Sequence, residues 1–105
     1  MGIFNNAQMT VERGGSPVSS IPSFAAQVDL MSQQEAAYYG GAAPYQRYMI
    51  YTVGTYDIRQ GDALIDALHI DPKRNALKQY RVINDPATEL FQRHNEIVAD
   101  LYRGT

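Results

Sequence analysis

The stretch that decides the fold is Tyr56-Asp57-Ile58-Arg59-Gln60-Gly61-Asp62, which precedes an apolar run from Ala63 to Ile70. Sixteen residues after Asp62 comes a second segment, Lys78 to Asn84, in which polar and apolar residues alternate. A glycine followed by aspartate is typical of a turn, and alternation is typical of a strand with one buried face. We therefore expect a turn at Gly61-Asp62 and a strand over residues 78–84.

Several other segments also predict strands. Phe24 to Met31 alternates, with its apolar residues on one face, and Gln46 to Val53 is rich in the Tyr, Ile and Val that strands favour. Asp71 to Asn75 predicts a turn, with Pro72 at its second position. The run 63–70 fits either a strand or a helical face. Together these segments predict a mainly β fold.

The two ends of the chain are harder to interpret. Residues 1–23 predict an irregular N-terminal arm, because Gly and Pro recur there, although Met9 to Arg13 would also suit a short strand that ends at Gly14-Gly15. Residues 24–105 are expected to form a single domain. In residues 87–103 the apolar positions follow a helical period, and either Asp85 or Thr88 would suit a helix cap. The same region also allows a closing strand over Asn95–Tyr102, so an α+β fold with a C-terminal helix is the alternative to a mainly β fold.

Composition limits the classes of function. At 105 residues the domain has a modest core, yet 45% of its residues are hydrophobic and 8 are tyrosine. Such a surplus suggests a surface covered by partners, while the alternative is that tyrosine simply fills strands. A net charge of −2 argues against a protein that binds nucleic acid by neutralising phosphates. The chain has no cysteine for disulfides, and it has no apolar run of the roughly 20 residues that a membrane span needs, so we expect no membrane partner.

A search for catalytic or metal-binding groups finds little. His69 lies near Asp71, and His94 lies near Glu96, but neither pair has a third ligand at a spacing typical of zinc sites. Asp62 and Asp66 would share one helix face, as solvated acidic pairs often do. There is no nucleophile elbow and no phosphate-binding glycine loop. We therefore expect no enzyme, no cofactor and no metal site.

Residues 36–45 predict a long loop in the first half of the domain. The segment combines two glycines and a proline with flanking tyrosines: Tyr38, Tyr39, Gly40, Gly41, Ala42, Ala43, Pro44 and Tyr45. Adjacent glycines lose much conformational freedom when they are ordered. The segment is either an ordinary exposed turn or a mobile loop that carries function. A capping box at Ser32 and Glu35 also allows a short helix before it.

The order of these segments resembles that of the head-closure, or stopper, proteins that join head and tail in tailed bacteriophages. The resemblance rests on a turn-and-strand motif followed by a His-x-Glu segment before a final strand. In this chain the motif residues are Asp57, Ile58, Gly61, Asp62, Tyr80 and Val82, and the later segment is His94-Asn95-Glu96. The match covers about the last half of the chain well and the first half in outline.

The resemblance implies a small β-barrel with a long loop in its first half. It implies a homo-oligomeric ring of roughly twelve copies in the virion neck, assembled in the host cytoplasm. Portal or adaptor proteins would lie on one side and tail or tail-terminator proteins on the other. DNA would pass through the channel without sequence recognition, and the loop at 36–45 would be the candidate gate. Another virion component, such as an adaptor, tail terminator or decoration protein, is the alternative.

Overall fold

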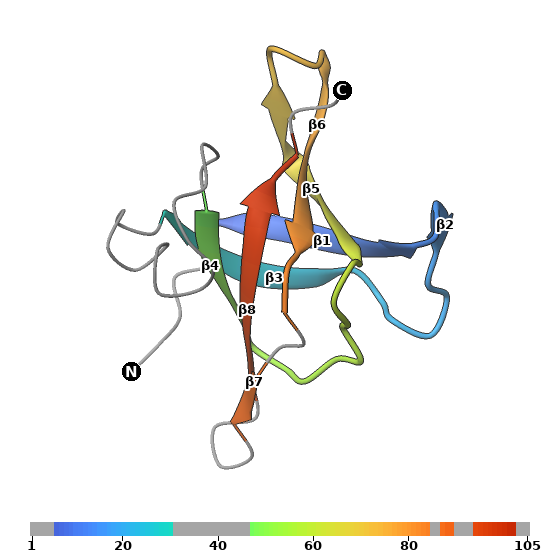
Figure 1. Cartoon of the computed structure of the whole chain (residues 1–105), viewed down its shortest axis with the longest axis vertical. Helices are drawn as coiled ribbons and strands as arrows, with labels where there is room; N and C mark the ends of the chain where they lie inside the picture. Colours follow the sequence, from blue (N-terminus) through green and yellow to red (C-terminus); the bar gives the residue numbers. More distant parts are fainter. Residues whose placement is uncertain (1–5, 31–46, 85–86, 90–93, 103–105) are drawn as a thin grey trace.

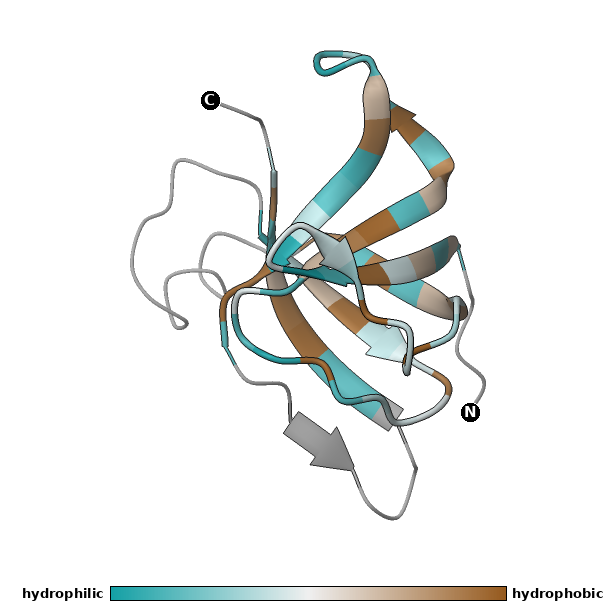
Figure 2. Ribbon diagram, turned by 90° about the vertical axis from the view of Figure 1, so that its right-hand side faces the viewer, coloured by the Kyte–Doolittle hydropathy of each residue, from teal (hydrophilic) through white to brown (hydrophobic). Residues whose placement is uncertain are grey.

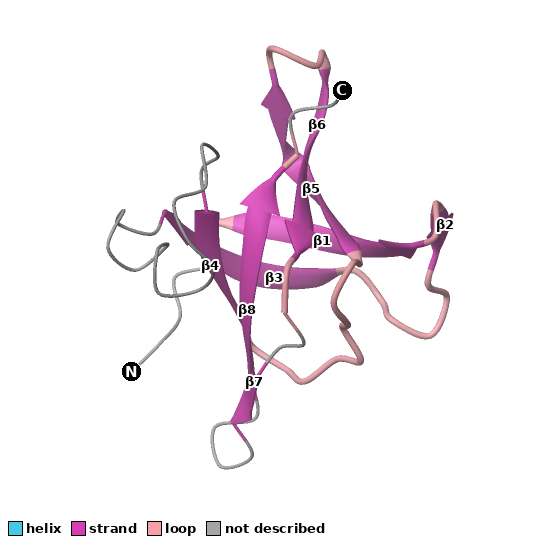
Figure 3. Ribbon diagram, in the orientation of Figure 1, coloured by secondary structure: helices cyan, strands magenta, loops and turns pink. Residues whose placement is uncertain are grey.

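The computed structural model describes residues 6–30, 47–84, 87–89 and 94–102, and within these ranges it contains only strands, turns and loops. Figure 3 shows this all-β content. The strands are β1 (Ala7–Arg13), β2 (Ser16–Pro17), β3 (Phe24–Leu30), β4 (Arg47–Thr52), β5 (Ala63–Asp71), β6 (Ala76–Val82), β7 (Ala87–Glu89) and β8 (His94–Leu101). The described ranges contain no helix long and apolar enough to cross a membrane.

Six of these strands close into an antiparallel barrel. Their order is β1-β3-β4-β8-β6-β5, and β5 pairs back with β1 to complete the circle. In Figure 1, β1 and β3 cross β4 and β8 at a steep angle, and the β5–β6 hairpin projects beyond the barrel at the top. β2 pairs with the end of β1, and β7 pairs with β8. The prediction of a small, mainly β barrel is confirmed.

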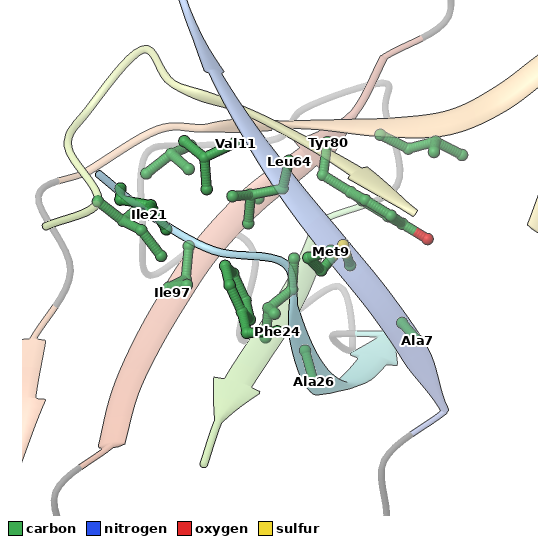
Figure 4. Close-up of a cluster of buried hydrophobic side chains, with 14 residues drawn as sticks. Ala7, Met9, Val11, Ile21, Phe24, Ala26, Leu64, Tyr80 and Ile97 are labelled. Atoms are coloured by element: carbon green, nitrogen blue, oxygen red, sulfur yellow. The ribbon is translucent and has the colours of Figure 1, made fainter. Parts of the chain in front are cut away.

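The barrel interior is a packed core, because each strand alternates between inward and outward side chains. Figure 2 shows this alternation as bands of hydrophobic and hydrophilic colour along the ribbons. Met9, Ile50, Leu64 and Ile97 are fully buried, and Figure 4 shows side chains from several strands meeting there. Burying one such side chain contributes about 1.5–3 kcal/mol, so these residues hold the strands together.

The structure corrects the prediction of an irregular N-terminal arm. Residues 7–13, which were placed in an irregular arm, form β1, the strand that closes the barrel between β3 and β5. Ala7, Met9 and Val11 face the core. The turn that follows has positive φ angles at Gly14 and Gly15, which glycine adopts without steric cost.

The helical interpretation of residues 87–103 is wrong for the residues described there. β7 and β8 occupy 87–89 and 94–101, and β8 lies between β4 and β6 in the barrel. Ile97, Ala99 and Leu101 face the core, yet Val98 on the other face is also buried, at 6% exposure. Burial on both faces places apolar residues next to one another, and that spacing imitates a helical stripe.

Of the remaining predictions, some are confirmed by the structure and others concern residues outside the described ranges. The expected strands over 24–31, 46–53 and 78–84 correspond to β3, β4 and β6, and the ambiguous run 63–70 belongs to strand β5. The expected turn connects β5 to β6: the backbone N–H of Arg74 donates to the Asp71 carbonyl at 3.2 Å, and Asn75 has a φ of 53°. The predicted loop at 36–45 lies outside the described residues, as does the possible helix that begins at Ser32.

Candidate functional site

The Gly61-Asp62 motif forms a structural clamp. The Asp62 carboxylate is 1% exposed, and it accepts hydrogen bonds from Nε and Nη2 of Arg13, both at 2.8 Å. The backbone N–H of Arg59 adds a third bond at 2.9 Å. Gly61 has a φ of 91°, and its N–H donates to the Val82 carbonyl at 2.8 Å. The motif therefore joins the end of β1 to the entry of β5 and the end of β6.

These partners stabilise the ionised form of Asp62. Burial alone would raise the pKa of the carboxyl group, but the hydrogen bonds from Arg13 and Arg59 outweigh burial and hold that pKa below its ordinary value. Asp62 is therefore ionised at neutral pH. A carboxylate that is hydrogen-bonded on both oxygens and ionised at neutral pH stabilises the fold and is a poor proton donor or acceptor there.

The other motif residues are also scaffold residues. Ile58, Tyr80 and Val82 are buried in the core. Asp57 is exposed and pairs with Arg59 at 2.8 Å, which lowers the pKa of Asp57. The structure thus brings the motif residues together around one corner of the barrel, where they build the fold.

The predicted histidine pairs are rearranged in the structure. His69 Nδ1 lies 2.5 Å from Oδ2 of Asp66, whereas the sequence had suggested Asp71 as its neighbour. The side chain of His94 lies outside the described residues. Asp66 is a strand residue that faces into the barrel, so the shared helix face with Asp62 does not exist. Among the described residues no group of three or more His, Cys, Asp or Glu side chains could hold a metal ion.

A bulge explains how His69 reaches Asp66. Asp66 pairs with Lys78 and Ile70 pairs with Leu77, so residues 67–69 of β5 have no register partner on β6. The bulge bends the strand and brings His69 back over Asp66. The backbone N–H of Leu68 donates to Asp66 Oδ1 at 2.9 Å and holds the bend.

Beyond the bulge, the β5–β6 hairpin exposes apolar side chains. Leu68 and Ile70 are each 65% exposed, and Leu77, the register partner of Ile70, is 40% exposed. We call Leu68, Ile70 and Leu77 the hairpin patch. The pairings of β5 with β1 and of β6 with β8 lie nearer the barrel, at residues 63–66 and 80–82. Apolar side chains on a projecting hairpin are typical of a surface that contacts a partner.

A second feature lies at the base of the hairpin, where one end of the barrel opens into a pocket of about 150 Å³. We call it the mouth pocket. The residues that line it are Asn6, Ala7, Val28, Tyr48, Lys78, Tyr80 and the Asp66–His69 pair. Tyr48 and Tyr80 meet edge to face at 5.2 Å, and burial, with smaller effects from Tyr48 and Asp66, raises the pKa of Tyr80. In Figure 4 the Tyr80 hydroxyl points toward the Ala7 end of β1.

Sequence reasoning missed both of these features for identifiable reasons. The pocket combines residues from five strands, and only the fold brings them together. The hairpin patch had a visible signal, because Leu68, Ile70 and Leu77 flank a turn. However, the strand pairing is needed to show that they project beyond the core.

Comparison with known proteins identifies the fold alone. No family model matches the chain, and no curated protein matches it. A solved structure that resembles it is the solution structure of protein SF1141 from Shigella flexneri 2a, a structural genomics target. That similarity has a TM-score of 0.64 at 14% identity and covers 96% of each chain. The barrel architecture is therefore shared with another natural protein of similar extent.

Proposed function

We propose that this protein is a structural component of the neck of a tailed bacteriophage, a head-to-tail connector of the stopper type. It forms a homo-oligomeric ring below the portal or adaptor, helps to retain packaged DNA and offers a surface for tail attachment. The observation that carries this proposal is the hairpin patch. A small barrel presents exposed Leu68, Ile70 and Leu77 on a projecting hairpin, as an assembly protein would.

The position of the sequence motif supports the same proposal. Gly61-Asp62 and Tyr80-Arg81-Val82 lie beside each other at one corner of a small closed barrel, and backbone bonds join Gly61 and Asp62 to Val82. The resemblance to stopper proteins implied a barrel of this kind. A closed barrel also leaves few strand edges that could pair non-specifically in a crowded assembly.

The alternative of a helical adaptor loses its main support. That alternative drew on a helix within residues 87–103, whereas residues 94–101 form barrel strand β8. Another virion component built on a small barrel, such as a tail terminator or a decoration protein, remains the alternative to a stopper. All of these are structural functions in which the hairpin patch contacts a neighbouring protein.

Electron microscopy of the native particle tests the proposal. We expect the protein as a ring coaxial with the DNA channel, directly below the portal or adaptor, with the β5–β6 hairpin against a neighbouring subunit or ring. A position on the capsid surface or at the far end of the tail would replace the stopper assignment with a decoration or terminator role. Absence from purified particles would reject the phage proposal altogether.

A further inference from the structure

The mouth pocket is lined by Lys78, which has no ion-pair partner among the described residues. Lys78 lies opposite Asp66 in the register of β5 and β6, which is the usual arrangement for a cross-strand ion pair. Within the described parts of the chain, the ion pairs involve other residues, and none includes Lys78. Lys78 is half-buried as a residue, and its ammonium group needs water or an anion to solvate it.

Asp66 does not pair with Lys78, because both oxygens of its carboxylate contact other groups. Its Oδ1 accepts hydrogen bonds from the backbone N–H groups of Gln8 and Leu68, at 3.3 and 2.9 Å. Its Oδ2 contacts Nδ1 of His69 at 2.5 Å. The bulge at residues 67–69 thus turns Asp66 toward the imidazole, and Asp66 pairs with His69 although Lys78 lies opposite it in the register.

The rest of the pocket suits a short organic chain. Ala7 and Val28 provide apolar surface, and the rings of Tyr48 and Tyr80 form an edge-to-face wall. The Tyr80 hydroxyl points toward the Ala7 end of β1, and Tyr80 lines the pocket, so this hydroxyl can donate a hydrogen bond to a ligand there. Barrel mouths with apolar walls and a few convergent polar groups are common sites for small ligands.

The charges in the pocket select the ligand class. The charged and titratable groups that face it are Lys78, Asp66, His69, Tyr48 and Tyr80. Lys78 is the one lysine or arginine among the described residues that line the pocket, and it matches one negative charge. Phosphate, which carries more charge and is usually bound by several cations or backbone N–H groups, fits less well. A pocket of about 150 Å³ has room for a few non-hydrogen atoms.

We propose that the mouth pocket binds a monocarboxylate group, with Lys78 and the Tyr80 hydroxyl contacting the carboxylate and Ala7 and Val28 contacting its alkyl chain. Asp66 and His69 are positioning residues, because they hold the bulge that keeps Lys78 unpaired. This inference is independent of the proposed neck function. The carboxylate belongs either to a free small acid or to an acidic side chain of a second copy of the protein.

The test is a titration of the isotope-labelled full chain with sodium butyrate, followed by nuclear magnetic resonance at constant ionic strength. Sodium chloride and sodium phosphate serve as comparison salts. We expect saturable shifts at the amides of Ala7, Val28 and Lys78, with a dissociation constant of about 1–10 mM, as is typical for so small a ligand. Shifts that do not saturate below about 100 mM, or phosphate binding as tight as butyrate binding, would overturn the proposal.

Variants localise the binding. Lys78→Gln should weaken butyrate binding at least about fivefold, because a charged hydrogen bond is lost. Tyr80→Phe keeps the buried ring and should weaken binding roughly two- to fivefold. Lys73→Gln is the matched control, since it removes the other lysine of the chain from the exposed hairpin turn. If Lys73→Gln weakens binding as much as Lys78→Gln, the effect is general electrostatics and the pocket assignment is wrong.

Sedimentation velocity with and without butyrate distinguishes a free small acid from an acidic side chain of a second copy as the source of the carboxylate. Dissociation of an oligomer by butyrate, reproduced by Lys78→Gln without butyrate, would identify the carboxylate as a side chain of a second copy. An unchanged sedimentation coefficient, together with saturable butyrate binding, would identify a free small acid. Both results support the pocket and assign its occupant.

Discussion

At the residue scale, Asp62 shows how a short sequence motif can be recognised before its role is understood. The Gly-Asp pair was expected to make a turn, and it does. What local sequence cannot show is that the carboxylate is bound by Arg13, 49 residues away. The same holds for Asp66 and His69, which meet only because the bulge in β5 brings them together. Side-chain partners across a barrel depend on register, and register is a property of the whole sheet.

The Asp62 clamp predicts a specific stability effect. Asp62→Asn keeps the shape of the side chain but removes its charge, and we expect the free energy of unfolding at pH 7 to fall by about 1–3 kcal/mol. Urea unfolding of the wild-type and variant proteins measures the difference. Asp57→Asn is the matched control: its pair with Arg59 is exposed, so its unfolding midpoint should stay close to that of the wild type. Equal losses in both variants would contradict a special role for Asp62.

The pH dependence of this effect has a definite sign. The folded state lowers the pKa of Asp62 below the ordinary value of 3.8, so ionisation of Asp62 stabilises the folded state. That contribution is present in full above the ordinary value, and it is lost as the pH falls through the lower, folded value. The difference in stability between wild type and Asp62→Asn should therefore shrink in acid. A difference that grows below pH 3.8 would contradict the assigned direction.

At the element scale, local alternation identified some strands, whereas burial on both faces or neighbouring Gly and Pro residues concealed others. β3 and β6 alternate, and both were expected. β8 is buried on both faces at Ile97 and Val98, which gave it the apolar spacing of a helix. β1 has a clear alternation at Ala7, Met9 and Val11, but the Gly and Pro residues that follow it predict an irregular arm.

The hairpin patch gives the element-scale test of assembly. Leu68→Ser combined with Ile70→Ser removes apolar side chains that are already exposed, so the free energy of unfolding should change by less than about 0.5 kcal/mol. We expect the variant to fold but to assemble poorly with its ring neighbours, as measured by its occupancy in purified particles. Thr10→Ser, on the exposed face of β1, is the control substitution. Full occupancy of the double variant would show that assembly uses another surface.

The loop at 36–45 lies outside the described residues, and its role stays a prediction from sequence. Deleting residues 40–43 should leave the barrel folded, because the described core contacts come from other segments. If the loop retains DNA, filled heads that carry the deletion should lose DNA, which a nuclease-protection assay would detect. Heads that keep their DNA with the deletion would remove the gating role from the proposal.

At the scale of the whole molecule, barrel closure between β1 and β5 is the feature that sequence could not supply. Its consequence is testable with two neighbouring residues of β1. Met9 is fully buried and Thr10 is exposed, so Met9→Ala should cost about 2–5 kcal/mol in unfolding free energy, whereas Thr10→Ala should cost little. Thermal or urea unfolding measures both values. Similar small effects would mean that β1 contributes little to the stability of the barrel, as expected of the irregular arm that the sequence predicts.

The same closure has a consequence for how the chain acquires its structure. Met9 pairs with Asp66, so this seam of the barrel joins segments that are synthesised far apart. Contacts between distant segments slow folding, because the entropy of loop closure is lost before the contacts form. Until β5 emerges from the ribosome, β1 presents an open edge with no strand beside it. Nascent chains should therefore aggregate more readily than finished ones, and a chaperone that shields β1 during synthesis would raise the yield of folded protein.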